Sequence, residues 1–137
     1  MVYQTARSNT PWGPVILVVE GSARRLQFLQ ANLEDAGFLV LSAATASHAL
    51  ELSDSCPAPI QLLITTLRPS GMTGPDLACC LRRRFPDMSV LYTSGNPLAT
   101  LEVPDPAEVV SSMLPRPISK EILLSRVNTL LAAHACV

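Results

Sequence analysis

The fold of this chain is decided by the stretch Ile60-Gln-Leu-Leu-Ile-Thr-Thr-Leu-Arg-Pro-Ser-Gly-Met-Thr-Gly74. The apolar run from Ile60 to Thr65 is typical of a buried parallel strand. A loop with two glycines follows, and Pro75 comes next, where the first turn of a helix tolerates proline. The stretch therefore predicts a strand, a loop and a helix, with the hydroxyl of Thr66 at the point where the strand ends.

Strands and helices are expected to alternate on both sides of this stretch. The expected strands are Val15–Val19, Phe38–Ala43, Ile60–Thr65, Val90–Thr93 and Met113–Leu114. The expected helices run from the cap Ser22 to Gly37, from Thr45 or Ser47 to Leu52, from Pro75 to Phe85, and onward from the cap Ser119. This alternation predicts a parallel sheet that is covered by helices on both faces.

The connection between the last two strands is unusual. A crossover helix is expected between residues 96 and 112, because parallel strands cannot be joined by a short turn. Pro104 and Pro106 lie in that segment, and a proline inside a helix costs about 3 kcal/mol. We therefore expect this fourth helix to be short, broken or displaced.

The bulk composition suits one domain. Of the 137 residues, 48% are hydrophobic and 15% are charged, so the chain can bury a core. Ten basic and eleven acidic residues give a net charge of -1, which does not call for nucleic acid or a membrane surface. We expect a flexible arm over residues 1–14, one domain over 15–133, a tail over 134–137 and a cytoplasmic location.

The candidate site lies where the strands end, because open α/β sheets bind ligands beyond the carboxyl ends of their strands. Those ends carry Glu20-Gly21, Thr66, Ser94-Gly95 and Arg116-Pro117. Apart from Glu20 and Arg116, these residues are neutral.

Four stretches, in this order, resemble the receiver domain of response regulators. They are Val18-Val-Glu-Gly-Ser22, Ile60–Gly74, Tyr92-Thr-Ser-Gly95 and Leu114-Pro-Arg-Pro117. The resemblance implies a flavodoxin-like (βα)5 fold, a three-layer sandwich around a five-stranded parallel sheet of order 2-1-3-4-5.

The resemblance also implies that the usual chemistry is lost. In the family, the phosphoacceptor aspartate stands eight residues before the second glycine of the loop, and counting back from Gly74 gives Thr66. The acidic pair corresponds to Glu20 and Gly21, so one carboxylate of three is kept. Magnesium prefers carboxylate ligands, and a threonine hydroxyl cannot form an acyl phosphate. We expect no cofactor, weak or absent Mg²⁺ binding and no catalysis.

The remaining pocket positions are expected to have structural roles. Ser94 is expected to serve as a structural hydroxyl. Arg116 keeps the positive charge of the family's lysine but not its geometry, and we expect it to pair with Glu20. Met113 occupies the place of the aromatic switch residue, and methionine cannot report phosphorylation by ring rotation.

The sequence is thus interpreted as a degenerate receiver, or pseudo-receiver, of a two-component phosphorelay. It would act by protein–protein contact, with a histidine kinase or an output protein as partner, and a homodimer stays open. One alternative is a working receiver with variant phosphoacceptor chemistry. The other is a dimerisation module cut from a larger sensor kinase.

Overall fold

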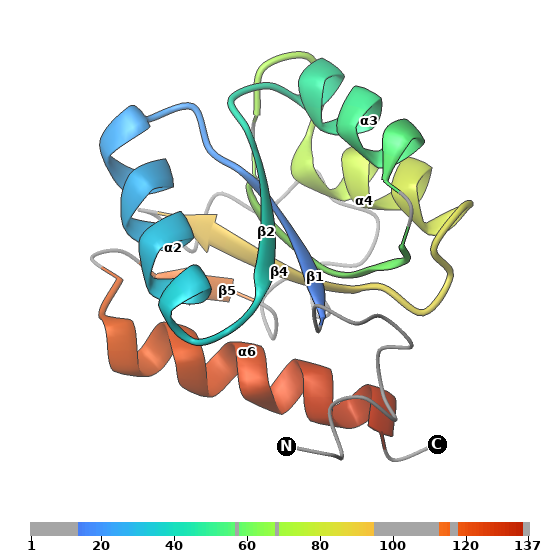
Figure 1. Cartoon of the computed structure of the whole chain (residues 1–137). Helices are drawn as coiled ribbons and strands as arrows, with labels where there is room; N and C mark the ends of the chain where they lie inside the picture. Colours follow the sequence, from blue (N-terminus) through green and yellow to red (C-terminus); the bar gives the residue numbers. More distant parts are fainter. Residues whose placement is uncertain (1–13, 57, 68, 95–112, 116–117, 136–137) are drawn as a thin grey trace.

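A five-stranded parallel sheet organises the molecule (Figure 1). The computed structural model describes residues 14–56, 58–67, 69–94, 113–115 and 118–135. The strands are β1 (Val15–Val19), β2 (Leu39–Ala43), β3 (Ile60–Thr66), β4 (Ser89–Ser94) and β5 (Met113–Pro115). Their order is β2-β1-β3-β4-β5 and all neighbours are parallel. The predicted sheet order is confirmed.

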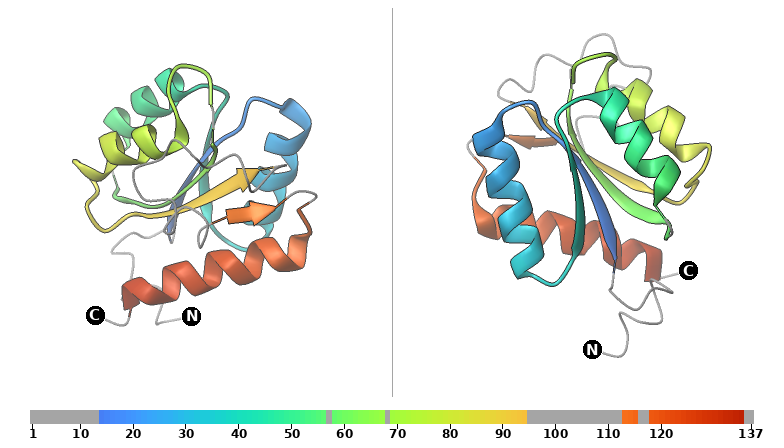
Figure 2. Two further views of the ribbon diagram at one scale, coloured as in Figure 1. Left: turned by 180° about the vertical axis from the view of Figure 1, so that it is seen from behind. Right: turned by 45° about the horizontal axis from the view of Figure 1, so that its top comes forward.

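Helices cover both faces of this sheet, as Figures 1 and 2 show. The helices α2 (Ala23–Asp35) and α6 (Lys120–Ala135) lie on one face, and α3 (Ala46–Ser55) and α4 (Gly74–Arg82) on the other. The predicted three-layer sandwich is therefore confirmed. The segment 96–112, with Pro104 and Pro106, and residues 1–13 of the arm expected over 1–14 lie outside the described residues. Within the described part, no helix is long and apolar enough to span a bilayer.

Local sequence signals explain where these helices begin and end. Each N-cap hydroxyl accepts a hydrogen bond from the backbone N–H three residues ahead, at 3.1–3.4 Å. The four caps are Ser22, Thr45, Thr73 and Ser119. Gly37 has a φ of 96°, a left-handed conformation that ends α2 as predicted.

Two apolar layers, one on each face of the sheet, hold the sandwich together. The central strand β1 contributes to both layers and is buried along its whole length. The residues of β1 alternate between the faces: Leu17 packs with α3 and α4, while Ile16 and Val18 pack with α2 and α6. The core is mostly aliphatic on both sides, with Phe85 and Tyr92 in one layer and Phe38 in the other. This packing fixes the direction in which each residue at the strand ends points.

The loop after β3 is held close to the end of the sheet. The amide of Gly74 donates to the carbonyl of Leu67 at 2.7 Å, and the amide of Ala46 donates to the carbonyl of Ser70 at 3.0 Å. Gly71 has a φ of 108°, which a residue with a side chain rarely adopts. The two glycines therefore let the loop fold back over Thr66.

Gly74 cannot carry a side chain without disturbing that loop. An added Cβ would lie 2.5 Å from the carbonyl oxygen of Thr66 and 3.1 Å from the ring of Tyr92. We predict that Gly74→Ala lowers the free energy of unfolding by about 1–3 kcal/mol, as overpacking of this kind does. Chemical denaturation measures it, with Gly21→Ala as the control, since the nearest atom there is 3.8 Å away. Equal midpoints for both variants would contradict this close approach.

Candidate functional site

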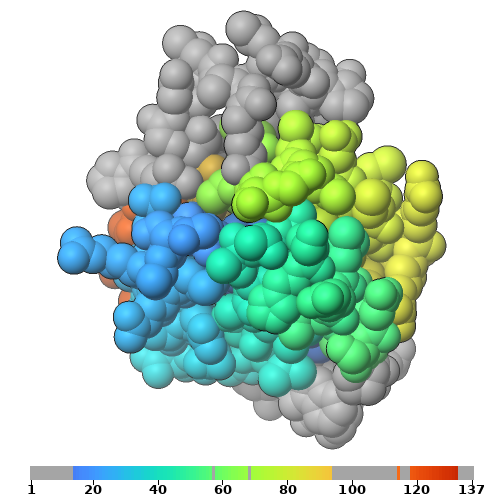
Figure 3. All heavy atoms as spheres, turned by 90° about the horizontal axis from the view of Figure 1, so that it is seen from above, coloured from blue at the N-terminus to red at the C-terminus, as the bar shows by residue number. Residues whose placement is uncertain are grey.

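The predicted pocket positions that the structure describes lie at the carboxyl edge of the sheet. Glu20 follows the last residue of β1, Thr66 ends β3 and Ser94 ends β4. These strands are adjacent, and Thr66 lies in register with Thr93. Seen from above in Figure 3, the start of α2 in blue, the start of α3 and the loop after β3 surround this region.

One polar side chain from each of three neighbouring strands faces α2 and α6. The residues two positions earlier, Val18, Ile64 and Leu91, belong to the apolar layer on that face. Side chains two positions apart on a strand point the same way, so Glu20, Thr66 and Thr93 continue the same rows. Glu20 is 2% exposed and Thr93 is 1% exposed, while Thr66 is half-buried.

Glu20 is held by the start of α2. Its Oε2 atom accepts a hydrogen bond from the backbone N–H of Ser22 at 3.0 Å and another from the Arg25 guanidinium at 3.1 Å. The Arg25 side chain is 44% exposed, so a charge at the surface compensates a carboxylate that is withdrawn from water. Because Glu20 points towards the face that α2 covers, the first turn of α2 is within reach.

The end of β3 offers a neutral oxygen. Thr65 donates its hydroxyl to the carbonyl of Thr66 at 3.0 Å, and the amide of Glu20 donates to Ala43 on the other side of β1 at 3.0 Å. Among the described residues, no hydrogen bond joins the Thr66 hydroxyl to a group that could act as a general base, and an unactivated hydroxyl is a weak nucleophile. The arrangement can form hydrogen bonds but is poorly equipped for group transfer.

Comparison with known proteins identifies the family. No family model matches the chain. A response regulator receiver protein from Sinorhizobium medicae WSM419 is 30% identical, with a TM-score of 0.73 over 88% of this chain and 96% of that one.

The chain belongs to the response-regulator receiver family.

Two further similarities point to receivers that form part of kinases. The receiver domain of the hybrid histidine kinase CckA is 29% identical, with a TM-score of 0.70 over 85% of this chain and 98% of that one. The sensor kinase CckA of Brucella abortus (strain 2308) is 28% identical over 117 residues. The match covers 85% of this chain and 12% of that kinase, so it concerns the receiver part alone.

The pocket of this receiver does not fit the magnesium ion that the family resemblance implies. Magnesium needs octahedral oxygen ligands, usually with carboxylates among them. The described part of the chain places the carboxylate of Glu20 at this edge, and its Oε2 atom already accepts hydrogen bonds from two protein donors, one of them cationic. Among the described residues, no three His, Cys, Asp or Glu side chains gather to hold a metal.

The structure describes most of the pocket residues that the sequence singled out. Glu20 and Gly21 follow β1, Thr66 ends β3, and Ser94 and Met113 lie on β4 and β5. Arg116, the expected partner of Glu20, lies outside the described residues. The sequence analysis missed Arg25, although two arginines in the first turn of a predicted helix were a usable signal.

The pairing of Glu20 with Arg25 predicts a stability effect. Arg25→Gln should lower the free energy of unfolding by about 1–3 kcal/mol, because a buried carboxylate loses a charged donor that is partly screened by water. The exposed neighbour is the control, and Arg24→Gln should change stability by less than about 0.5 kcal/mol. Thermal or urea unfolding measures both. A similar decrease in the free energy of unfolding in both variants would show that the Glu20–Arg25 pair makes no specific contribution to stability.

Proposed function

We propose that this receiver signals through protein contacts and carries no phosphoaspartate. The observation that supports the proposal best is the state of the carboxyl edge, where Thr66 ends β3 and Arg25 binds Glu20. A working receiver needs an acceptor carboxylate and a bound cation at this edge. Here a hydroxyl takes the first place, and an arginine of the chain itself supplies the positive charge.

The charge balance of the edge supports the same proposal. A phosphoryl group brings negative charge that must be neutralised during transfer. The Arg25 guanidinium could offset part of that charge, but the transfer also needs a nucleophile that can form an acyl phosphate. Glu20 is 2% exposed and is bound by Ser22 and Arg25, so it is poorly placed to take over the attack. The proposal therefore includes no enzymatic activity and no metal cofactor.

The kind of partner follows from the relatives. Similarity to the receiver of a hybrid histidine kinase favours a histidine kinase, or a protein that works beside one, as the binding partner. Such a partner would recognise the surface of the domain rather than a phosphorylated state. A cytoplasmic location is part of this proposal, as expected for a receiver that contacts a kinase.

A second candidate function is a receiver module within a larger sensor kinase. The match to the Brucella abortus kinase covers 12% of that protein, which is the share that one domain among several would take. In this role the domain would contact other domains of the same chain. The remaining alternative is a working receiver with a variant phosphoacceptor. Incubation with acetyl phosphate distinguishes it from the two functions that involve no phosphorylation.

Acetyl phosphate tests the absence of phosphoryl transfer. We predict that incubation with acetyl phosphate and Mg²⁺ leaves the intact mass unchanged, because Thr66 cannot form an acyl phosphate and Glu20 is only 2% exposed. Intact-mass spectrometry measures the outcome. A stoichiometric gain of one phosphoryl group that hydroxylamine removes would reveal a variant acyl phosphate and defeat the proposal.

A variant with the family's acids restored is the positive control. Glu20→Asp, Gly21→Asp and Thr66→Asp together should gain Mg²⁺ binding and one labile phosphoryl group. Gly21 has room for a side chain, since the nearest atom to an added Cβ is 3.8 Å away. The variant should be less stable, because like charges would crowd one edge of the sheet. Its folding is checked by circular dichroism before the mass is compared.

A further inference from the structure

The charges of α2 run against the dipole of the helix. Anionic side chains favour the N-terminus of a helix and cationic side chains favour its C-terminus. In α2 the first turn contains Arg24 and Arg25 and no acid, while Glu34 and Asp35 stand in the last turn without a base. Arg25 binds Glu20, and Glu34 accepts a hydrogen bond from Gln30. Arg24 and Asp35 have an unfavourable position that neither of these local contacts explains.

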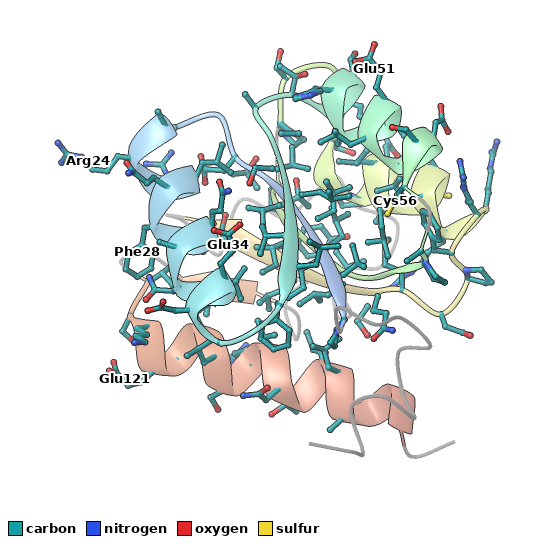
Figure 4. The ribbon with its side chains drawn as sticks, in the orientation of Figure 1. Arg24, Phe28, Glu34, Glu51, Cys56 and Glu121 are labelled. Carbon is teal, nitrogen blue, oxygen red and sulfur yellow. The ribbon has the colours of Figure 1, made fainter. Side chains whose placement is uncertain are left out.

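Four residues of α2 form a single exposed stripe that begins and ends with these two charges. Arg24, Phe28, Ala31 and Asp35 follow one another at intervals of four, three and four residues, the spacing of a helix–helix seam. Three of them are exposed, and Phe28 is half-buried against the apolar layer under α2. Figure 4 shows Arg24 and Phe28 on the outer side of α2, away from β2. We call these four residues the α2 seam.

We propose that the α2 seam binds the α2 seam of a second copy of this chain, with the two helices antiparallel. A two-fold axis through the middle of the helix pairs Arg24 of each copy with Asp35 of the other. The same axis places Phe28 of each copy against Ala31 of the other. Opposite charges thus meet at both ends, and a large side chain faces a small one in the centre.

Self-complementarity is the reason to choose a second copy as the occupant. An isologous interface uses the same patch on both subunits, so each contact occurs twice. The charges of α2 meet this requirement, because in an antiparallel pair the basic start of each helix faces the acidic end of the other. The charges that are unfavourable within one helix become favourable between two.

The size of the seam sets the expected strength. One pair of short helices lies at the low end of interface sizes, so we expect a dissociation constant of roughly 0.1–1 mM. The charged pairs at the two ends of the seam are exposed to solvent. Association should therefore weaken as the ionic strength rises above about 0.1 M, where the Debye length is about 10 Å. The inference is independent of the pocket chemistry, and its failure would leave the proposed function untouched.

Charge reversal tests the pairing. Arg24→Asp leaves acids at both ends of the seam, and Asp35→Arg leaves bases at both ends. Each variant alone should associate at least about tenfold more weakly than the native chain, because like charges then face each other. An equimolar mixture of the two should form a heterodimer, since every end pair is again opposite in sign. Sedimentation equilibrium up to about 1 mM measures all three, in line with the affinity expected of a small interface.

The same variants report their own folding. Each reversal puts a charge where the helix dipole favours it, so the monomer's Tm should rise by about 1–4 °C while association falls. A variant that merely disturbed the fold would lose both. Arg83→Asp, at an exposed residue that ends α4, is the matched control and should leave association unchanged.

Three results would overturn the proposal. The native chain could sediment as a monomer at every concentration, in which case the seam is a solvated helix face. The Arg24→Asp variant could self-associate with the same dissociation constant as the native chain, which would place the interface elsewhere. Finally, the mixture of Arg24→Asp and Asp35→Arg could associate no better than either variant alone, which would rule out the antiparallel pairing.

Discussion

A carboxylate that is withdrawn from water must be held by donors or by a positive charge, and Glu20 has both within five residues of chain. The first turn of α2 supplies them: the backbone N–H of Ser22 and the guanidinium of Arg25. In receivers that work by phosphorylation, the corresponding acidic edge is completed by a metal ion. Here the Arg25 guanidinium, which belongs to the polypeptide, supplies a positive charge to Glu20.

The fold imposes this solution through the alternation of side chains along the strands. The apolar layer under α2 and α6 uses every second residue of β1, β3 and β4, and the rows end in Glu20, Thr66 and Thr93. A charge at the end of the β1 row must therefore be met from α2, which lies over it. Gly74 keeps the loop after β3 close to Thr66. The same helix also carries the seam proposed for self-association: Arg25 contacts the pocket residue Glu20, while Arg24 begins the α2 seam.

Much of this was predictable, because the signals were local. The unbroken apolar run Val15–Val19 gave a central strand, the hydroxyl of Ser22 gave a helix start and Gly37 gave its end, all as observed. The two arginines at the start of the helix were a signal for a charged contact, but the pairing of Arg25 with Glu20 in particular could not be read from them. Whether Arg25 can reach Glu20 depends on how the chain turns between β1 and α2, and periodicity says nothing about that turn. The burial of Thr93 likewise depends on its neighbours in the assembled sheet.

The central proposal is that Ser22 and Arg25 hold the Oε2 atom of Glu20 in place of a cation, so that this carboxylate forms no tight cation site. A Mg²⁺ titration followed through backbone amide chemical shifts tests it most directly. The account predicts no saturation at Glu20, Gly21 or Thr66 below about millimolar Mg²⁺, because Oε2 of Glu20 is already bound by Ser22 and Arg25 and no second direct carboxylate ligand stands at Gly21 or Thr66. Saturable shifts that cluster at these three residues at sub-millimolar Mg²⁺ would contradict it.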